Sequence, residues 1–190
     1  CPALGPLMKV KQVIDVHAHI LLPGVMGSCG VAGPEMGFRA NGNEFFRAGD
    51  YVLENVNFNN SPFSVPQKRV EKMAQLGIDL QLVSPNPITY FYNQPTRSGI
   101  EFNRRHNDEV ANICRDHIQL IGAAALPLQD PKAACEELNR AISTLGMVCS
   151  YIGTDVNGHA LSDPRFEELW SEHERLNIPV VIHPGPRGSY

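Results

Sequence analysis

Short apolar runs alternate with amphipathic stretches along most of the chain. Five runs are brief, apolar and bounded by turn-forming residues, which predicts β-strands at 13–17, 78–84, 120–126, 148–153 and 179–183. Most of these runs lack a clean polar alternation, as is typical of parallel strands that are covered by helices. The pattern therefore predicts an α/β fold built on a parallel sheet.

Apolar residues at three- and four-residue steps predict helices between these strands. Three helices are expected at 66–77, about 100–117 and 131–146, and a fourth runs from Pro164 to Leu176. Asp163 is a plausible N-cap, directly before Pro164 at the first helical position. This order excludes all-α and all-β folds and leaves a doubly wound open sheet or a (β/α)₈ barrel. No GxGxxG motif follows the first strand, which weakens a dinucleotide-binding open sheet.

Residues 20–65 break this regularity, with many glycines, scattered aromatic residues and little periodicity. An insertion of this length between a strand and its helix is typical of a functional lid or binding loop. The alternative is a surface excursion with its own small apolar cluster around Phe45, Phe46, Tyr51 and Phe58.

The composition narrows the classes of protein to consider. The chain has 190 residues, of which 43% are hydrophobic and 19% charged, which excludes a disordered tail, a coiled coil and a collagen-like fibre. A net charge of -4 without a basic stripe argues against a nucleic-acid partner. No apolar run approaches the ~20 residues that span a bilayer, so no membrane association is expected. Five cysteines without CxxC spacing predict reduced thiols in a cytoplasmic protein.

The first strand carries the pattern with most chemical content, IDVHAH. Alternate residues of a strand share a face, so Asp15, His17 and His19 are expected on one side. Paired imidazoles at a strand end pack poorly but bind divalent transition metals well, the alternative being two hydrogen-bonded structural histidines. His183 ends the fifth strand in VVIHPGP. Because the carboxyl ends of parallel strands converge on one rim of a barrel, His17, His19 and His183 are predicted to meet as metal ligands.

These motifs together resemble the metal-dependent amidohydrolase superfamily, in the branch of aminocarboxymuconate-semialdehyde decarboxylase and its relatives. The resemblance runs from about residue 13 to the end and rests on VIDVHAHI, RVEKMAQLGIDLQLVS, LPLQDPKAACEELNRAISTLG, IGTDVNG and VVIHPGP. It implies a (β/α)₈ TIM barrel with a divalent metal, commonly zinc, held at the carboxyl rim by His17, His19 and His183. Residues 1–190 would then be the N-terminal part of one barrel domain, with about its first five strands and a long loop insertion at 20–65.

The resemblance also implies roles for further residues. An arginine in the loop after the first strand binds a substrate carboxylate in that decarboxylase, and its position falls on Arg47, since a guanidinium forks onto a carboxylate. The alternatives are a solvated loop arginine, or Arg39 in its place. The family's catalytic histidine on the sixth strand and metal-binding aspartate on the eighth fall beyond Tyr190, so no catalytic residue is assigned.

The leading expectation for function is a non-oxidative decarboxylase of a small carboxylated aromatic or muconate-like substrate, in which the metal lowers the pKa of a bound water. The alternatives are a hydrolase or hydratase that uses a metal-bound hydroxide, and a non-catalytic half-barrel or binding module. The family resemblance also suggests a homodimer.

The remaining polar and aromatic candidates are weaker. His106 is expected on a charged, solvated helix face, and His117 and His173 in structural roles. His159 is a candidate for the pocket. The aromatic run 90–92 either walls the substrate or packs in the core.

Overall fold

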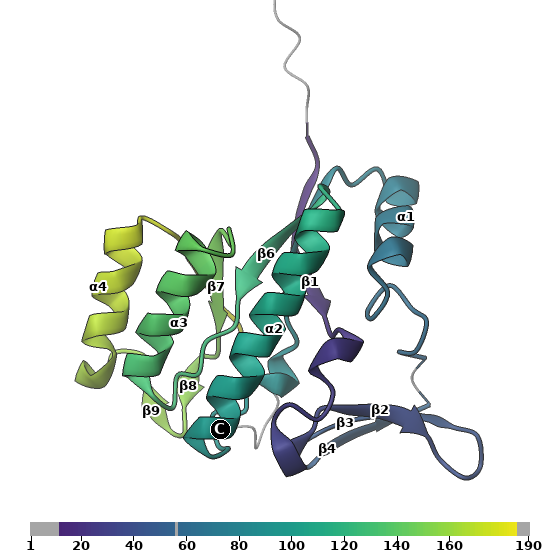
Figure 1. Cartoon of the computed structure of the whole chain (residues 1–190), viewed down its shortest axis with the longest axis horizontal. Helices are drawn as coiled ribbons and strands as arrows, with labels where there is room; N and C mark the ends of the chain where they lie inside the picture. Colours follow the sequence, from purple (N-terminus) through teal and green to yellow (C-terminus); the bar gives the residue numbers. More distant parts are fainter. Residues whose placement is uncertain (1–11, 56, 186–190) are drawn as a thin grey trace, which may run out of the picture.

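Five parallel strands form the main sheet of the computed structural model, which describes residues 12–55 and 57–185 (Figure 1). They are β1 (Ile14–Ile20), β5 (Leu80–Pro85), β6 (Leu120–Ala124), β7 (Cys149–Ile152) and β10 (Val180–Ile182), side by side in that order. The strands follow one another in chain order, whereas a doubly wound sheet reverses its strand order part-way. This order favours the barrel over the open sheet.

The sheet is strongly curled. Strands β1 and β10 lie at opposite edges, where a flat sheet of this size would hold them roughly 19 Å apart at ~4.8 Å per strand. The Nε2 atoms of His17 in β1 and His183 after β10 nevertheless lie 3.2 Å apart. The sheet is therefore half of a TIM-type barrel, as the sequence predicts. Its edges remain open, since Ile14, Val16 and Ile182 on the edge strands are each about half exposed or more.

Helices connect successive strands: α1 (Pro66–Leu76), α2 (Thr96–Asp116), α3 (Pro131–Ser143) and α4 (Glu167–Leu176). In Figure 1, α2, α3 and α4 lie side by side in front of the sheet. The Asp130 carboxylate accepts a hydrogen bond from the Ala133 N–H at 3.0 Å and so caps α3. Gly77 ends α1 in the left-handed conformation, with φ at 68°. The predicted helices are confirmed in order and approximate extent.

The last predicted helix begins as a 3₁₀ turn. Asp163 caps η4 (Pro164–Phe166) by accepting from the Arg165 N–H at 3.0 Å, and α4 continues from Glu167. The apolar face predicted for this segment is buried, with Phe166 and Leu169 fully enclosed. His173 on the same face bonds to the Ser150 hydroxyl at 2.7 Å and to the Leu169 carbonyl at 2.8 Å, which confirms its structural role.

The insertion after β1 is more regular than the sequence suggests. It contains β2 (Glu35–Phe38), β3 (Glu44–Ala48) and β4 (Tyr51–Glu54), which form an antiparallel sheet in the order β2-β3-β4. Two 3₁₀ turns, η1 (Pro23–Val25) and η2 (Gly30–Ala32), precede this sheet. Figure 1 shows the insertion at one end of the main sheet, beside the N-terminal end of α2.

The apolar cluster of the insertion differs from the predicted one. Phe46 is fully buried with its ring 5.4 Å from that of Phe58, as expected, but Tyr51 is exposed. The Phe45 ring lies under the Arg39 guanidinium, with 4.2 Å between the guanidinium carbon and the ring centroid. The remaining buried members lie in or beside the elements that flank the insertion, and they include Leu21 after β1, Val25 in η1, Cys29 before η2, Phe91 before α2 and Phe102 in α2. The insertion is thus joined to the main domain by a second apolar core.

The prediction for His106 is wrong. This residue lies within α2, fully buried, with its ring stacked on Phe102 at a centroid distance of 5.9 Å. Neither ring nitrogen has a hydrogen-bond partner among the described residues. Burial therefore lowers the pKa of His106 to about 4.

The described cysteines are all buried or half-buried. Cys29, Cys114, Cys135 and Cys149 are free thiols, and burial raises the pKa of each to about 11. They are therefore protonated and poorly nucleophilic at neutral pH. Cys1 lies outside the described residues.

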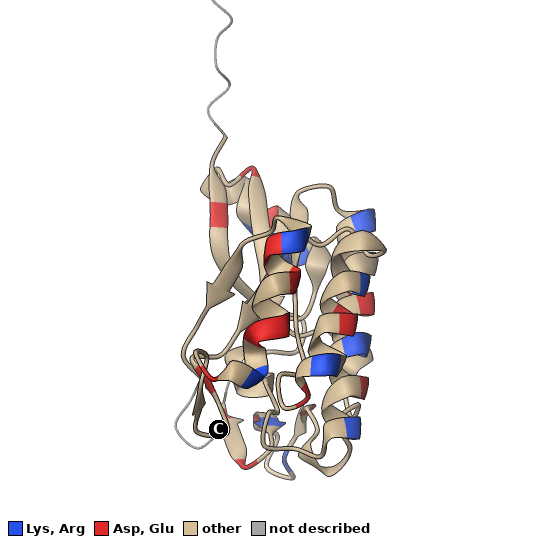
Figure 2. Ribbon diagram, turned by 90° about the vertical axis from the view of Figure 1, so that its left-hand side faces the viewer, with Lys and Arg blue, Asp and Glu red and all other residues tan. Residues whose placement is uncertain are grey.

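No helix among the described residues has the length and apolar character needed to cross a membrane. Acidic and basic side chains are interspersed along the outer helices (Figure 2).

Candidate metal centre

Three imidazoles from the two edges of the curled sheet meet one another. His17 and His19 lie in β1, and His183 follows β10 directly. The Nε2 atom of His17 lies 3.2 Å from that of His19 and 3.2 Å from that of His183. The three rings are mutually edge-on, with each pair of centroids 5.0 Å apart. The structure thus brings the three residues together, and their role as metal ligands stays a prediction.

The spacing of the three nitrogens suits a metal ion. A tetrahedral zinc ion with bonds of ~2.0–2.1 Å to imidazole nitrogens holds them about 3.3–3.4 Å apart. The observed separations of 3.2 Å are close to that value. Across the described part of the chain, these residues form the one group of three or more His, Cys, Asp or Glu side chains that could hold a metal ion.

Hydrogen bonds at the other ring nitrogens select the tautomer that a metal needs. The Nδ1 atom of His19 lies 3.1 Å from the Pro85 carbonyl and 3.0 Å from the Ser84 hydroxyl. The Nδ1 atom of His183 lies 2.6 Å from the Pro184 carbonyl. A carbonyl can only accept, so Nδ1 of each ring carries the proton and its Nε2 lone pair faces the cluster.

The surroundings of His19 favour its neutral form. Burial, followed by the neighbouring His183 and His17, lowers the pKa of His19 to about 4. His19 is therefore uncharged at neutral pH, the state in which an imidazole binds a metal.

Asp15 does not join the three histidines. A bulge interrupts β1 between Asp15 and Ala18, so the strict alternation predicted for Asp15, His17 and His19 does not hold. The carboxylate accepts hydrogen bonds from the His17 backbone N–H at 3.0 Å and from the Gln81 amide at 2.7 Å. Its position is fixed by these contacts rather than by the cluster.

Buried tyrosines support the strand ends around the cluster. The Tyr151 ring lies 5.6 Å from that of His19 and 5.5 Å from that of His183, centroid to centroid. The Tyr90 hydroxyl lies 3.3 Å from the His183 carbonyl, to which it can donate, and the Tyr92 hydroxyl accepts from the Gly153 N–H at 3.1 Å. The aromatic run 90–92 is buried, which favours the packing interpretation.

The two arginines of the insertion are each bonded to a glutamate. In Arg47, on β3, Nε lies 3.1 Å and Nη2 2.9 Å from the two carboxylate oxygens of Glu35 on β2. Its Nη1 donates to the carbonyls of Val31 and Gly49. The Nε of Arg39 lies 3.2 Å from the Glu54 carboxylate. The guanidinium of Arg47 is thus held in the forked geometry expected for a carboxylate, but by a residue of the chain itself.

His159, the remaining candidate for the pocket, is not part of the histidine cluster. His159, in the hairpin formed by β8 (Asp155–Val156) and β9 (His159–Ala160), pairs with the Asp163 carboxylate at 3.3 Å. Asp155 accepts from the Gly158 N–H and so stabilises the turn of that hairpin.

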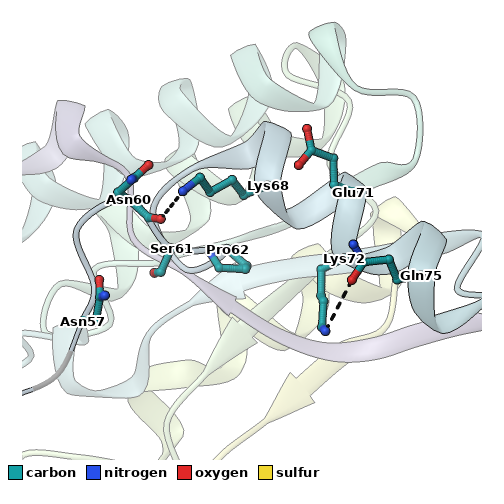
Figure 3. Close-up of a pocket in the computed structure, with 8 residues that line it drawn as sticks. All are labelled: Asn57, Asn60, Ser61, Pro62, Lys68, Glu71, Lys72 and Gln75. Atoms are coloured by element: carbon teal, nitrogen blue, oxygen red, sulfur yellow. Dashed lines mark hydrogen bonds between the residues drawn. The ribbon is translucent and has the colours of Figure 1, made fainter.

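A hollow between the end of the insertion and α1 holds no histidine (Figure 3). It is lined by Asn57, Asn60, Ser61, Pro62, Lys68, Glu71, Lys72 and Gln75. Its lysines are bonded, Lys68 to the Asn60 carbonyl and Lys72 to the Gln75 amide. The histidine cluster is therefore the better candidate for chemistry.

Comparison with known proteins decides the family. The amidohydrolase family model matches residues 14–189. The chain belongs to the amidohydrolase family. The match spans nearly the whole chain, and the resemblance predicted from the motifs is confirmed.

Relatives of this amidohydrolase include named decarboxylases. The gamma-resorcylate decarboxylase of Rhizobium sp. (strain MTP-10005) is 32% identical over 150 residues, which cover 73% of this chain and 44% of that protein. The 2-amino-3-carboxymuconate-6-semialdehyde decarboxylase of Dictyostelium discoideum is 30% identical over 120 residues, or 63% of this chain and 33% of that protein. The chain thus spans a third to less than half of the length of these relatives.

Solved structures agree with the half-barrel fold. The 2,6-dihydroxybenzoate decarboxylase from Rhizobium is 25% identical with a TM-score of 0.71, over 94% of this chain and 52% of that one. The dihydroxybenzoic acid decarboxylase from Polaromonas sp. JS666, solved with bound manganese, is 22% identical with a TM-score of 0.70, over 94% of this chain and 51% of that one. The latter likeness concerns the fold.

Proposed function

We propose that this amidohydrolase chain forms the metal-binding part of a divalent-metal-dependent, non-oxidative decarboxylase. Its substrate would be a small carboxylated aromatic or muconate-like compound. The observation that carries the proposal is the convergence of three Nε2 atoms, with 3.2 Å between His17 and each of the other two histidines. Relatives named as decarboxylases of such compounds, at 30–32% identity, support the choice of reaction.

The histidines of the cluster and the groups beside them would have separate roles. His17, His19 and His183 would hold the cation through Nε2, and the Pro85 and Pro184 carbonyls keep two of these rings in the required tautomer. A divalent cation held there would supply a Lewis acid that polarises an oxygen of the substrate or of water. The Tyr151 ring beside His19 and His183 shields one side of the cluster from solvent.

Zinc is the expected metal, because neutral imidazoles at near-tetrahedral spacing suit it. Manganese is the competing candidate, since a Polaromonas decarboxylase of the same fold was solved with it. Nitrogen ligands bind zinc more tightly than manganese, but affinity along the first-row series peaks at copper. Availability in the cell therefore also influences which metal is bound.

Arg47 is proposed to bind the carboxylate of the substrate. Its guanidinium already holds the Glu35 carboxylate in a two-bonded fork, so a substrate carboxylate would have to replace Glu35. Glu35 lies on the surface with its side chain half exposed, which makes such an exchange feasible at small cost.

A metal-loading assay with 2,6-dihydroxybenzoate tests the function. The protein, expressed from its full coding sequence and purified, is stripped of metal, reloaded with zinc or manganese, and followed for release of carbon dioxide. Release that needs the metal and is lost in His17→Ala, but kept in the control His117→Ala, would support the decarboxylase.

Other outcomes separate the alternatives. Cleavage of a lactone without any carbon dioxide from carboxylated aromatic or muconate-like compounds would favour a hydrolase. Less than about a tenth of an equivalent of bound metal, unchanged in His17→Ala, would favour a non-catalytic module. The predicted homodimer is tested separately, by light scattering.

A further inference from the structure

A buried arginine lies against the strand that carries the paired histidines. Arg69 of α1 is only 7% exposed. Its Nη2 donates to the backbone carbonyl of His19 at 2.6 Å, and its Nε donates to the carbonyl of Pro62 at 2.9 Å. Its Nη1 donates to the side-chain carbonyl of Gln81 at 2.8 Å. All three nitrogens of the guanidinium are therefore engaged, one of them directly with a residue of the cluster.

The contacts of Arg69 continue to the other histidine of β1. The side-chain amide of Gln81, on β5, donates to the Asp15 carboxylate at 2.7 Å. The other oxygen of Asp15 accepts from the backbone N–H of His17 at 3.0 Å. The resulting chain, Arg69–Gln81–Asp15, thus begins at the carbonyl of His19 and ends at the amide of His17.

This polar chain occupies the place where β1 departs from regular pairing. A bulge between Asp15 and Ala18 removes the backbone of His17 from the ladder with β5. The Asp15 carboxylate satisfies the freed N–H of His17, and Arg69 holds the carbonyl of His19 on the other side of Ala18. The N–H of His17 and the carbonyl of His19 are therefore each bonded to a side chain, although His19 itself stays in register with Ser84 of β5.

Packing alone does not account for such an arrangement. Burying a guanidinium and a side-chain amide removes both from water, and an apolar set of the same volume often stabilises a fold as well or better. Every bond of the chain, apart from that to Pro62, lies on the path between the two histidines. The arrangement of these hydrogen bonds thus favours a role in placing the two histidines.

We propose that Arg69, acting through Gln81 and Asp15, is a positioning residue that holds His17 and His19 at the spacing needed to bind a metal. This inference rests on the metal centre proposed above. Removal of the network should loosen the two rings and weaken the metal affinity by 10- to 100-fold, the range typical of groups that orient metal ligands. The three histidines themselves would remain in place to bind more weakly.

The test compares zinc affinity with stability in matched variants. Arg69→Met removes the guanidinium and Arg69→Lys keeps the charge without the fork. Arg140→Met is the control, because the Arg140 guanidinium is likewise engaged by side chains of the protein, Glu137 on α3 and Asp108 on α2, but makes no contact with the Arg69–Gln81–Asp15 chain. The zinc dissociation constant is measured by competition with a chelator, and unfolding of the metal-free protein by urea.

Arg69→Met is expected to bind zinc about 10- to 100-fold more weakly while still folded, with Arg69→Lys between it and the parent, and Arg140→Met within about twofold of the parent. A purely structural role would lower the urea midpoint without changing zinc affinity in the folded protein. An affinity within about twofold of the parent in folded Arg69→Met would therefore overturn the proposal.

Asp15→Asn covers the case in which Arg69→Met does not fold. The asparagine keeps one acceptor for the His17 amide but presents an NH₂ group to the amide of Gln81, so the network is broken while the volume is unchanged. Weaker zinc binding in this variant supports the proposal, and unchanged binding overturns it. If the parent protein itself binds no zinc, the metal centre fails as well, which distinguishes that outcome from a failure of the positioning role alone.

Discussion

The histidine cluster and the arginines of the insertion differ in what already faces their functional groups. At the cluster, His17 Nε2 lies 3.2 Å from the Nε2 of each of the other two histidines, without a carboxylate among the three residues. In the insertion, Arg47 and Arg39 each have a glutamate of a neighbouring strand as partner. The comparison teaches that one region brings nitrogen lone pairs together without a charged partner among its three residues. The other region supplies its own.

The two regions also differ in how they are supported. The cluster depends on the ends of parallel strands and on the buried contacts of Arg69 and Ser84. The arginines lie on a small antiparallel sheet whose apolar core centres on Phe46. Changes in one region should therefore leave the other largely intact, and the following predictions test that separation.

The largest effect is expected from His17→Ala. Loss of one of three ligands should weaken zinc binding by more than ~100-fold, beyond the effect expected for groups that only orient ligands. Because His17 is exposed, the metal-free stability should change by less than about 0.5 kcal/mol. Chelator competition and urea unfolding measure the two quantities, with His117→Ala as control. Equal affinity in both variants would mean that the cluster is not the metal site.

The next effect concerns His106, whose ring nitrogens have no hydrogen-bond partner in the part of the chain that the structure describes. Its pKa is about 4 in the folded chain, against an ordinary value near 6.5, so the unfolded state binds a proton first as pH falls. The contribution of His106 to stability is thus complete above about pH 6.5 and is lost progressively as pH falls toward 4. Between about pH 7.5 and pH 5, the parent should lose about 2 kcal/mol more stability than His106→Phe. Parallel pH profiles of urea unfolding would contradict this.

A smaller change is expected from Phe46→Leu in the core of the insertion. Phe46 is fully buried against Phe58 and Phe63, so the replacement leaves space and should cost about 1–2 kcal/mol. Thermal unfolding of the metal-free protein measures the loss. Zinc affinity should stay within about twofold of the parent, and a tenfold change would show that the insertion and the cluster are coupled.

The smallest effect on stability is expected from Glu35→Gln. The exposed ion pair with Arg47 contributes less than about 1 kcal/mol, but its removal frees the fork of Arg47. If Arg47 binds the substrate carboxylate, 2,6-dihydroxybenzoate should bind several-fold more tightly to this variant. Glu54→Gln, which frees Arg39 in the same way, is the matched control. An equal gain in both variants, or none in either, would argue against a special role for Arg47.

Most of the main domain could be predicted from sequence because its signals are local. Caps such as Asp130 and apolar steps such as Phe166 to Leu169 depend only on neighbouring residues. The strands of the insertion gave a weaker signal, since they have only 4, 5 and 4 residues. The pairing of Arg47 with Glu35 follows from the β2–β3 register, which brings residues twelve positions apart face to face.

Part of the site was predictable and part was not. The convergence of His17, His19 and His183 follows from the rule that parallel strands end on one rim. The contact between Arg69 and the His19 carbonyl could not be predicted, because the bulge after Asp15 breaks the alternation on which the prediction relied. Gln81, a polar residue in the mostly apolar strand β5, was the available signal for that network.

The prediction of a solvated helix face for His106 is wrong because it relied on the charge of neighbouring residues. Its charged neighbours suggested a solvated face, but it lies four residues after Phe102 and four before Val110, both fully buried. Helical periodicity was therefore the better guide than local charge at this position.

Nitrogen-detected NMR of the histidine side chains during a zinc titration tests the central claim most directly. The chain has seven histidines, and each ring reports its own tautomer and ligation. One equivalent of zinc should shift the Nε2 resonances of His17, His19 and His183 together and leave those of His106, His117, His159 and His173 unchanged. Saturation at other histidines, or no shift at the three, would contradict the account.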